Sequence, residues 1–351
     1  MIVGYFLLVL CIMLQGIPYL VHKSPLLAKL FLVCGFGELW LLATFRTPTF
    51  VTDDMGYLEM FYAPSLCYTE WGYCWLNNFI RMFGTEQYIL FAVLAFLLFA
   101  SMAVFIYRYS DNVVVSVLTY ICLMYAFNAL NGVRQFLAIS VIFLAFPLVQ
   151  KKRFWLFLGA VCLACLFHKS AIICLSFYWL YNNVKVNVKN ISIIVVVILI
   201  MCLVFDQLSG LYTSLGGGYA GYLTPDAEQG RLSSIIRLLV NSSIALFALL
   251  ISKENNQSGI APKISIDFLT LCSCISATGA LISLQAYNME RIVYYFYIFN
   301  IITLPNIILR LKNKLLGAGI MTMAVVLVVL YGVTVIWSWE KQGKMLTFLW
   351  S

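Results

Sequence analysis

Residues 88–107 read YILFAVLAFLLFASMAVFIY, a run of twenty positions without one charged side chain. A bilayer core needs about 20 apolar residues per helical span, so this stretch is predicted to cross a membrane as an α-helix. Comparable stretches recur from Met1 to Trp337, and 63% of the 351 residues are hydrophobic while only 10% are charged. A soluble domain carries roughly 25% charged residues. The sequence therefore predicts an all-α, polytopic membrane helix bundle and excludes a soluble fold.

We expect about twelve spans, with ten or eleven as the alternative, in a single transmembrane domain over residues 1–351. The first span lacks a basic leading segment and a cleavage site, so it is expected to be a retained helix rather than a signal peptide. The expected bounds are 1–21, 26–45, 88–107, 112–127, 135–150, 154–167, 170–182, 191–205, 236–252, 266–285, 292–309 and 315–337.

The basic residues of the short loops predict the orientation of these spans, because cytoplasmic loops carry an excess of Lys and Arg. One side then holds Lys23, Arg108, residues 151–153, Lys185 with Lys189, Lys253 with Lys263, and Arg310 with Lys312 and Lys314. That side is predicted to be the cytoplasm. The net charge of +8 is attributed to this bias, and no nucleic-acid partner is expected.

The segment 154–181 decides whether this orientation holds for the rest of the chain. A single long helix there would invert every later span and move the basic residues around Lys312 to the outside. We therefore expect a helical hairpin or a broken helix that turns near His168. Irregular backbone at membrane depth is tolerated where it lines a cavity inside the protein.

Two long external loops are expected, at 46–87 and 206–235, and both mix aromatic with charged residues. Residues 70–81 in the first loop have helical apolar spacing, which predicts a helix lying along the membrane interface. Cys67 and Cys74 in the same loop either pair as a disulfide or stay free, since an external loop is an oxidising setting.

The arginines and lysines divide between the two sides of the predicted membrane. Ten of the thirteen lysines fall inside, whereas six of the nine arginines fall outside: Arg46, Arg81, Arg134, Arg231, Arg237 and Arg291. The planar guanidinium binds phosphate or carboxylate with two parallel hydrogen bonds. These arginines either converge on an anion such as a lipid pyrophosphate or pair with acids of the outer loops.

Three further residues are candidates for proton transfer. His168, at the expected break, either acts as a general base or is a structural histidine. Polar groups at membrane depth are costly, which favours a function. The pair Asp53-Asp54 either binds a divalent metal, acts as a base, or is simply solvated.

Several motifs, in this order, resemble those of the EpsG family of Wzy-type polysaccharide polymerases. They are RTPTFVTDDMGY at 46–57, EWGY at 70–73, NALNGVRQFLA at 128–138, FHKSA at 167–171 and RIVYY at 291–295. Thr52 stands where the family has a glycine, so either Asp53 or Asp54 corresponds to the family's aspartate. The resemblance implies a bundle like that of C-type membrane glycosyltransferases.

The resemblance also implies the reaction, its substrates and its location. A growing glycan on undecaprenyl pyrophosphate would be transferred to the non-reducing end of a lipid-linked repeat unit, at the outer face of a bacterial inner membrane. Undecaprenyl-pyrophosphate-linked oligosaccharide would thus be both donor and acceptor, and a chain-length regulator and a flippase would be further partners. Arginines would replace a metal, so no cofactor is expected.

The expected roles follow from this reaction. Arg134, Arg291 and Arg46 would neutralise the pyrophosphate, and His168 would be the base, with Asp53 or Asp54 as the alternative. The residues expected to position sugars are Gln135, Glu70, Tyr57, Tyr73, Asn131 and Tyr295.

Two other functions fit a membrane bundle with an outer cationic site. A flippase for the same lipid-linked sugar should have comparable polar lining on both faces, whereas the polar residues here gather outside. A membrane O-acyltransferase that modifies surface glycan would need reactive motifs at the inner face, where His22 is the one histidine.

Overall fold

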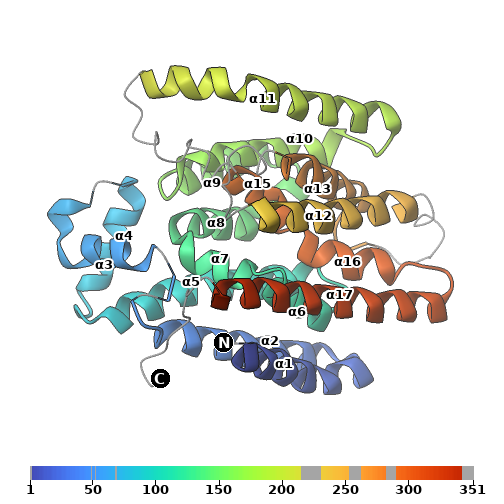
Figure 1. Ribbon diagram of the computed structural model, residues 1–351, viewed down its shortest axis with the longest axis horizontal. Coiled ribbons are helices and arrows are strands. Elements are labelled where there is room, and N and C mark those ends of the chain that lie inside the picture. Colours follow the sequence, from blue (N-terminus) through green and yellow to red (C-terminus); the bar gives the residue numbers. More distant parts are fainter. Residues whose placement is uncertain are drawn as a thin grey trace. The chain divides into compact units, whose positions relative to one another are not determined.

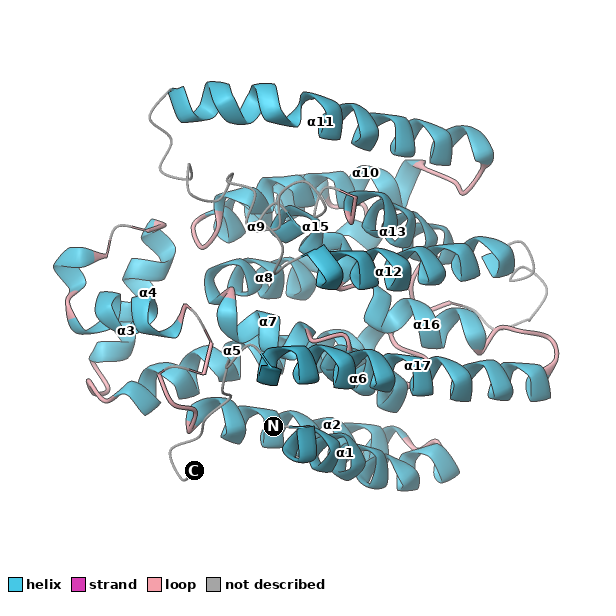
Figure 2. Ribbon diagram, viewed as in Figure 1, coloured by secondary structure: helices cyan, strands magenta, loops and turns pink. Residues whose placement is uncertain are grey.

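The computed structural model describes residues 2–48, 50–51, 53–67, 69–214, 231–252, 262–281 and 290–341, and this part of the chain is built of helices joined by loops, without a β-strand (Figures 1 and 2). It divides into two compact units. Unit 1 comprises residues 1–178 and 322–351, and unit 2 comprises residues 179–321. The all-α class predicted from composition is confirmed.

Unit 1 contains the first half of the chain and the end of the last helix. Its elements are α1 (Ile2–His22), α2 (Pro25–Thr44), α3 (Asp54–Tyr62), the 3₁₀ turn η1 (Pro64–Leu66), α4 (Trp71–Arg81), α5 (Gln87–Tyr109), α6 (Val113–Cys122), α7 (Tyr125–Asn131), α8 (Val133–Gln150), α9 (Phe154–Cys165), the 3₁₀ turn η2 (Lys169–Cys174), the start of α10 (Leu175–Asn183) and the end of α17 (Lys314–Lys341).

The core of unit 1 is a series of packed helices in which α5 contacts α2 and α8, and α8 contacts α9. The rings of Phe105 and Phe143 stack between α5 and α8 with centroids 3.9 Å apart. Ser101 donates across the same interface to Ser140, with 2.7 Å between the hydroxyl oxygens. Close packing and hydroxyl pairs are what hold helices together in lipid, where the hydrophobic effect does not distinguish helix from lipid.

Unit 2 is arranged around α13 (Ile266–Gly279). This helix contacts α11 (Val188–Ser214), α12 (Arg231–Ser252), α15 (Glu290–Tyr297) and α16 (Asn300–Ile308). A buried chain of amides and hydroxyls links three of them: Asn300 donates to Asn241 at 2.8 Å and accepts from Ser273 at 2.7 Å. Of the expected external loop 206–235, residues up to Ser214 and from Arg231 are helical, and 215–230 lie outside the described residues.

The described helices that could cross a membrane are fewer than the twelve expected spans. Six are long and apolar enough: α1, α2, α5, α8, residues 291–308 and α17. The pair α6 and α7, bent by 55°, would add a seventh. Each expected span does contain helix, but several are short or broken. Four shorter apolar helices add to these in the described residues: Phe154–Cys165, Val188–Ile200, Ile235–Ile251 and Ile266–Gly279. The polytopic bundle is confirmed, and the exact number of spans stays a prediction.

The expected break near His168 is confirmed. Helix α9 ends at Cys165, His168 has extended backbone (φ −157°, ψ 116°), and η2 follows. The chain then returns along α9, because Tyr178 donates to the Lys152 carbonyl at 2.9 Å and packs on Phe154 with ring centroids 5.1 Å apart. Residues 154–178 thus form a helical hairpin rather than one long helix.

Candidate functional site

The segment between α2 and α5 is folded around a disulfide between Cys67 and Cys74, whose Cα atoms are 5.8 Å apart. The sequence left this pairing open, and the structure shows the bonded form. The bond joins the loop after η1 to the first turn of α4, so residues 67–74 form a closed ring. Glu70 lies inside that ring and is the N-cap residue of α4.

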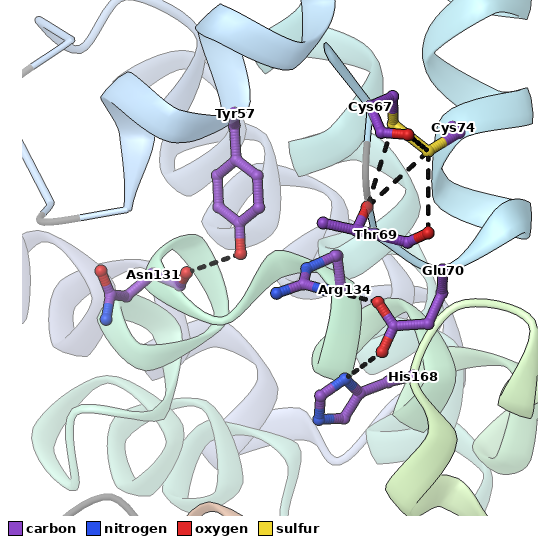
Figure 3. A network of polar contacts seen from close by, with 8 residues as sticks. All are labelled: Tyr57, Cys67, Thr69, Glu70, Cys74, Asn131, Arg134 and His168. Carbon is purple, nitrogen blue, oxygen red and sulfur yellow. Dashed lines mark hydrogen bonds and ion pairs between the residues drawn. A yellow bond between two sulfur atoms is a disulfide. The ribbon is translucent and has the colours of Figure 1, made fainter. Parts of the chain in front are cut away.

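Glu70 connects two residues that are distant in sequence (Figure 3). Its Oε2 atom forms an ion pair with the Arg134 guanidinium, and its Oε1 atom accepts a hydrogen bond from His168 Nδ1 at 3.2 Å. The Glu70 side chain is 4% exposed, whereas those of Arg134 and His168 are each 20% exposed. The carboxylate is therefore enclosed, and the two groups that it holds reach the surface. We call these three residues the Glu70 network.

The backbone next to His168 explains how α4 reaches the hairpin. The Gly72 N–H donates to the Leu166 carbonyl at 2.8 Å. A Cβ atom added to Gly72 would lie 2.7 Å from that same oxygen, closer than two such atoms can approach. Only glycine permits this contact, which fixes the first turn of α4 against the turn that carries His168.

Arg134 is held near Glu70 by the break between α7 and α8, since α7 ends at Asn131 and α8 begins at Val133. Asn131, at this break, receives two hydrogen bonds from the segment after α2. The Asp53 N–H donates to its Oδ1 atom at 3.1 Å, and the Tyr57 hydroxyl donates to its carbonyl at 3.0 Å. The start of α8 is thus tied to α3.

The electrostatics of the Glu70 network favour an ionised carboxylate. Burial by itself would raise the pKa of Glu70, but the hydrogen bond from His168 and the charge of Arg134 outweigh it and lower the pKa to about 2. An ionised carboxylate only accepts hydrogen bonds. His168 Nδ1 must then carry the hydrogen, so in the neutral ring Nε2 carries the lone pair.

Arg46 and Asp54 do not occupy the positions expected of an anion-binding group and a base. They form a buried pair, 1% and 0% exposed, in which the Arg46 Nε and NH2 groups donate to the two Asp54 oxygens at 2.9 and 2.7 Å. Arg46 also donates to the Ala43 carbonyl and lies 3.8 Å from the Phe91 ring centroid. The pair closes the turn after α2, and we assign it a structural role.

The residues expected to position sugars have different environments. Glu70 binds side chains of the protein instead, and Asn131 is half-buried beside the network. Tyr57, Tyr73 and Gln135 are buried at 4%, 0% and 3% exposure, and the Tyr57 and Tyr73 rings pack with centroids 5.5 Å apart. Tyr57 and Tyr73 thus pack α3 against α4.

The remaining expected residues are not part of the Glu70 network. Asp53 is half-buried and adjacent to Asn131 through its backbone. Arg291 and Tyr295 belong to unit 2, on α15, where Tyr295 is buried and Arg291 is half-buried. Their roles stay predictions.

Reasoning from the sequence missed the position of Glu70 between His168 and Arg134. The available signal was its place between Cys67 and Cys74, which marks it as the most constrained acid of the loop. In the described part of the chain, no three His, Cys, Asp or Glu side chains come together as a metal site would require. Metal-independent chemistry stays a prediction.

Comparison with protein families decides the identity. Residues 29–349, nearly the whole chain, match the EpsG family. The chain belongs to this family. EpsG proteins are Wzy-like polymerases, so the resemblance predicted from the five motifs is confirmed, and the chain is a membrane protein of the polysaccharide-polymerase type. No curated protein and no solved structure gives a significant match.

Proposed function

We propose that this EpsG protein is a glycosyltransferase that polymerises lipid-linked oligosaccharides into an exopolysaccharide or O-antigen. The growing glycan leaves undecaprenyl pyrophosphate and joins the non-reducing end of a lipid-linked repeat unit. The observation that carries the proposal is the Glu70 network. It presents a cation and an oriented imidazole together, held by one buried carboxylate.

His168 is the proposed general base. Its Nε2 lone pair takes the proton of the acceptor hydroxyl while that oxygen bonds to the anomeric carbon of the donor sugar. The bond between this carbon and the phosphate oxygen breaks, and its electron pair leaves with the pyrophosphate. Glu70 fixes the ring through Nδ1 and stabilises the imidazolium that forms, as carboxylate partners of catalytic histidines do. Asp53 is the alternative base.

Arg134 is the proposed partner of the leaving group. Charge develops on the pyrophosphate as the glycosidic bond breaks, and a pre-positioned guanidinium stabilises it without reorganisation. Because Glu70 holds Arg134 and His168 at once, the leaving group and the acceptor hydroxyl would be positioned relative to one another. Arg291 is proposed as a second cation, and Asn131, next to Arg134, as a hydrogen-bonding partner for a sugar.

The proposed reaction takes place at the outer face of a bacterial inner membrane. Helix α8 carries Arg134 in its first turn and precedes Lys151, Lys152 and Arg153. Its 18 residues rise about 27 Å, close to the thickness of the hydrocarbon core. The network and this basic turn then lie at opposite membrane faces, and the basic turn belongs in the cytoplasm. A disulfide beside Glu70 also favours an oxidising compartment.

Deleting the gene tests the proposed function. We expect surface glycan to be reduced to single repeat units on their carrier, with the ladder of longer chains lost on a gel. An intact ladder would rule out a polymerase. Repeat units that accumulate only on the cytoplasmic side would indicate a flippase, and full-length glycan lacking acyl groups would indicate an O-acyltransferase.

Complementing the deletion with point variants tests the residue roles. We expect His168→Ala to lower the polymerisation rate by about 10²–10⁴, the usual contribution of a general base. Arg134→Lys should impair it nearly as much as Arg134→Ala, because lysine lacks the planar fork. His22→Ala, the other histidine of the chain, is the matched control and should complement fully. Normal polymerisation by His168→Ala would move the base to Asp53.

A further inference from the structure

Unit 1 contains a cavity of about 320 Å³ between α1, α2, α5, α7 and α17. Its walls are almost wholly apolar and include Leu8, Leu39, Leu42, Phe50, Phe127 and Leu130. Gly4 also lines it and is exposed, and a Cβ added there would meet no atom within 4 Å. Well-packed helices leave few voids of this size, so a cavity of this kind is a candidate binding site.

Two separate chain segments connect this cavity to the Glu70 network. On the first, Phe50 lines the cavity, and Asp53 and Tyr57 follow. On the second, Leu130 lines the cavity, Asn131 follows at the end of α7, and Arg134 lies just across the break, in the first turn of α8.

The two segments are fastened to each other along this path. The Phe50 ring stacks on Phe127 with centroids 6.4 Å apart. Further along, Asp53 and Tyr57 both donate hydrogen bonds to Asn131. The cavity and the network are therefore two ends of one connected structure, apolar at one end and carrying the Arg134 guanidinium at the other.

This arrangement matches an amphiphile whose charged group is directly attached to a hydrocarbon chain. A sugar or a phosphate would be poorly solvated among these leucines and phenylalanines, because buried polar groups require hydrogen-bonding partners. A hydrocarbon chain needs none and gains from each buried methylene. In a lipid pyrophosphate, the chain begins at the phosphate, which the proposed function assigns to Arg134.

We propose that the cavity binds the polyisoprenyl chain of the lipid-linked substrate, at the units nearest the pyrophosphate. This inference rests on the proposed function and adds the site of the lipid. The cavity then selects the carrier and sets the depth at which the pyrophosphate meets Arg134. Residues on α2 and α7 that line it are specificity determinants rather than catalytic residues.

A cavity-filling variant with a matched control tests this site. Gly4 lines the cavity, and a Cβ there meets nothing within 4 Å, so Gly4→Trp adds an indole at the cavity lining without a backbone clash. Gly37 on α2 has the same open surroundings but does not line the cavity. Gly37→Trp therefore controls for the added indole.

The probe is undecaprenyl pyrophosphate with a photoreactive diazirine on an isoprene unit near the phosphate, added to the full-length purified protein. We expect cross-links on the α2 and α7 peptides that contain Leu42 and Phe127. Gly4→Trp should lower the affinity about tenfold, the loss of roughly two buried methylene groups, and Gly37→Trp should not change it. Cross-links elsewhere, or equal affinity in both variants, would overturn the proposal.

Ordinary bilayer lipid is the other possible occupant of the cavity. A phosphatidylglycerol carrying the same diazirine should label the cavity weakly and be displaced by unlabelled undecaprenyl pyrophosphate. Equal labelling without displacement would show that the cavity holds bulk lipid, which overturns the proposal while leaving the polymerase function intact. A failure of the proposed polymerase function would be recognised separately, because the deletion strain would then keep an intact glycan ladder.

Discussion

Glu70 is the residue on which the geometry of the site depends, because one carboxylate holds both the cation and the histidine. Its pKa falls from 4.5 to about 2. A carboxyl group with a depressed pKa stabilises the fold above its unfolded pKa, and this contribution is lost as the pH falls through the folded value. Glu70 therefore stays ionised at neutral pH.

This shift predicts how stability depends on pH. Between pH 4.5 and 2, wild type should lose about 3 kcal/mol through Glu70, and Glu70→Gln should lack this component. Unfolding of the detergent-solubilised protein by denaturant across that range measures it. Glu59→Gln, an exposed acid on the neighbouring α3, is the control and should follow wild type. If the free energy of unfolding depended on pH in the same way in Glu70→Gln and Glu59→Gln, the lowered pKa of Glu70 would be contradicted.

The buried pair of Arg46 and Asp54 yields a second prediction at the same scale. Asp54→Asn leaves a buried guanidinium uncompensated and should cost about 3–5 kcal/mol of stability. The double variant Arg46→Met/Asp54→Leu removes both charges and should regain most of that loss. If the pair is structural, the double variant should also retain polymerisation. A stably folded double variant without polymerase activity would restore a role for Arg46 or Asp54 in the reaction.

Among the elements, the ring closed by Cys67 and Cys74 orders the loop that carries Glu70. Closing a ring of this length should stabilise the fold by about 2–3 kcal/mol. We predict that Cys67→Ser/Cys74→Ser loses this stability and lowers polymerisation, measured by denaturant unfolding and by glycan ladders. Cys34→Ser/Cys162→Ser, which alters two exposed free thiols, should behave as wild type. A Cys67/Cys74 variant with unchanged ladders would show that the ring is dispensable.

The helices and the contacts between them differ in how far the sequence predicts them. Apolar runs such as 88–107 predict α5 closely, and the basic residues of the later loops correctly required a turn near His168. The break between α6 and α7 was missed, because it depends on Met124 adopting a left-handed backbone (φ 64°) in an apolar run. A left-handed backbone at one residue leaves no periodic pattern in the sequence from which it could be predicted.

Side-chain pairings across long separations were harder to predict than helices. Glu70 lies 64 residues before Arg134 and 98 before His168, so no local pattern joins them. The sequence did not distinguish among the many possible ion pairs between the outer acids and the outer arginines. Only the docking of α4 through Gly72 selects Glu70 for this role, and that contact depends on backbone geometry.

At the scale of the whole molecule, membership of the EpsG family and the long apolar helices establish a membrane protein of the polymerase type. Its orientation is the property on which the proposed reaction depends. The proposed polymerisation of lipid-linked units requires the Glu70 network to face away from the cytoplasm. The basic turn 151–153 must then face inward.

Labelling of introduced cysteines tests this orientation. Glu86 precedes α5 on the side of the network, Lys151 follows α8 on the opposite side, and both are exposed. A membrane-impermeant maleimide should label Glu86→Cys in intact cells, or after outer-membrane permeabilisation. It should label Lys151→Cys only after the inner membrane is opened. The parent protein measures the background of the native thiols. The reverse pattern would place His168 and Arg134 in the cytoplasm, where a nucleotide-activated donor rather than a flipped lipid-linked one would be within reach.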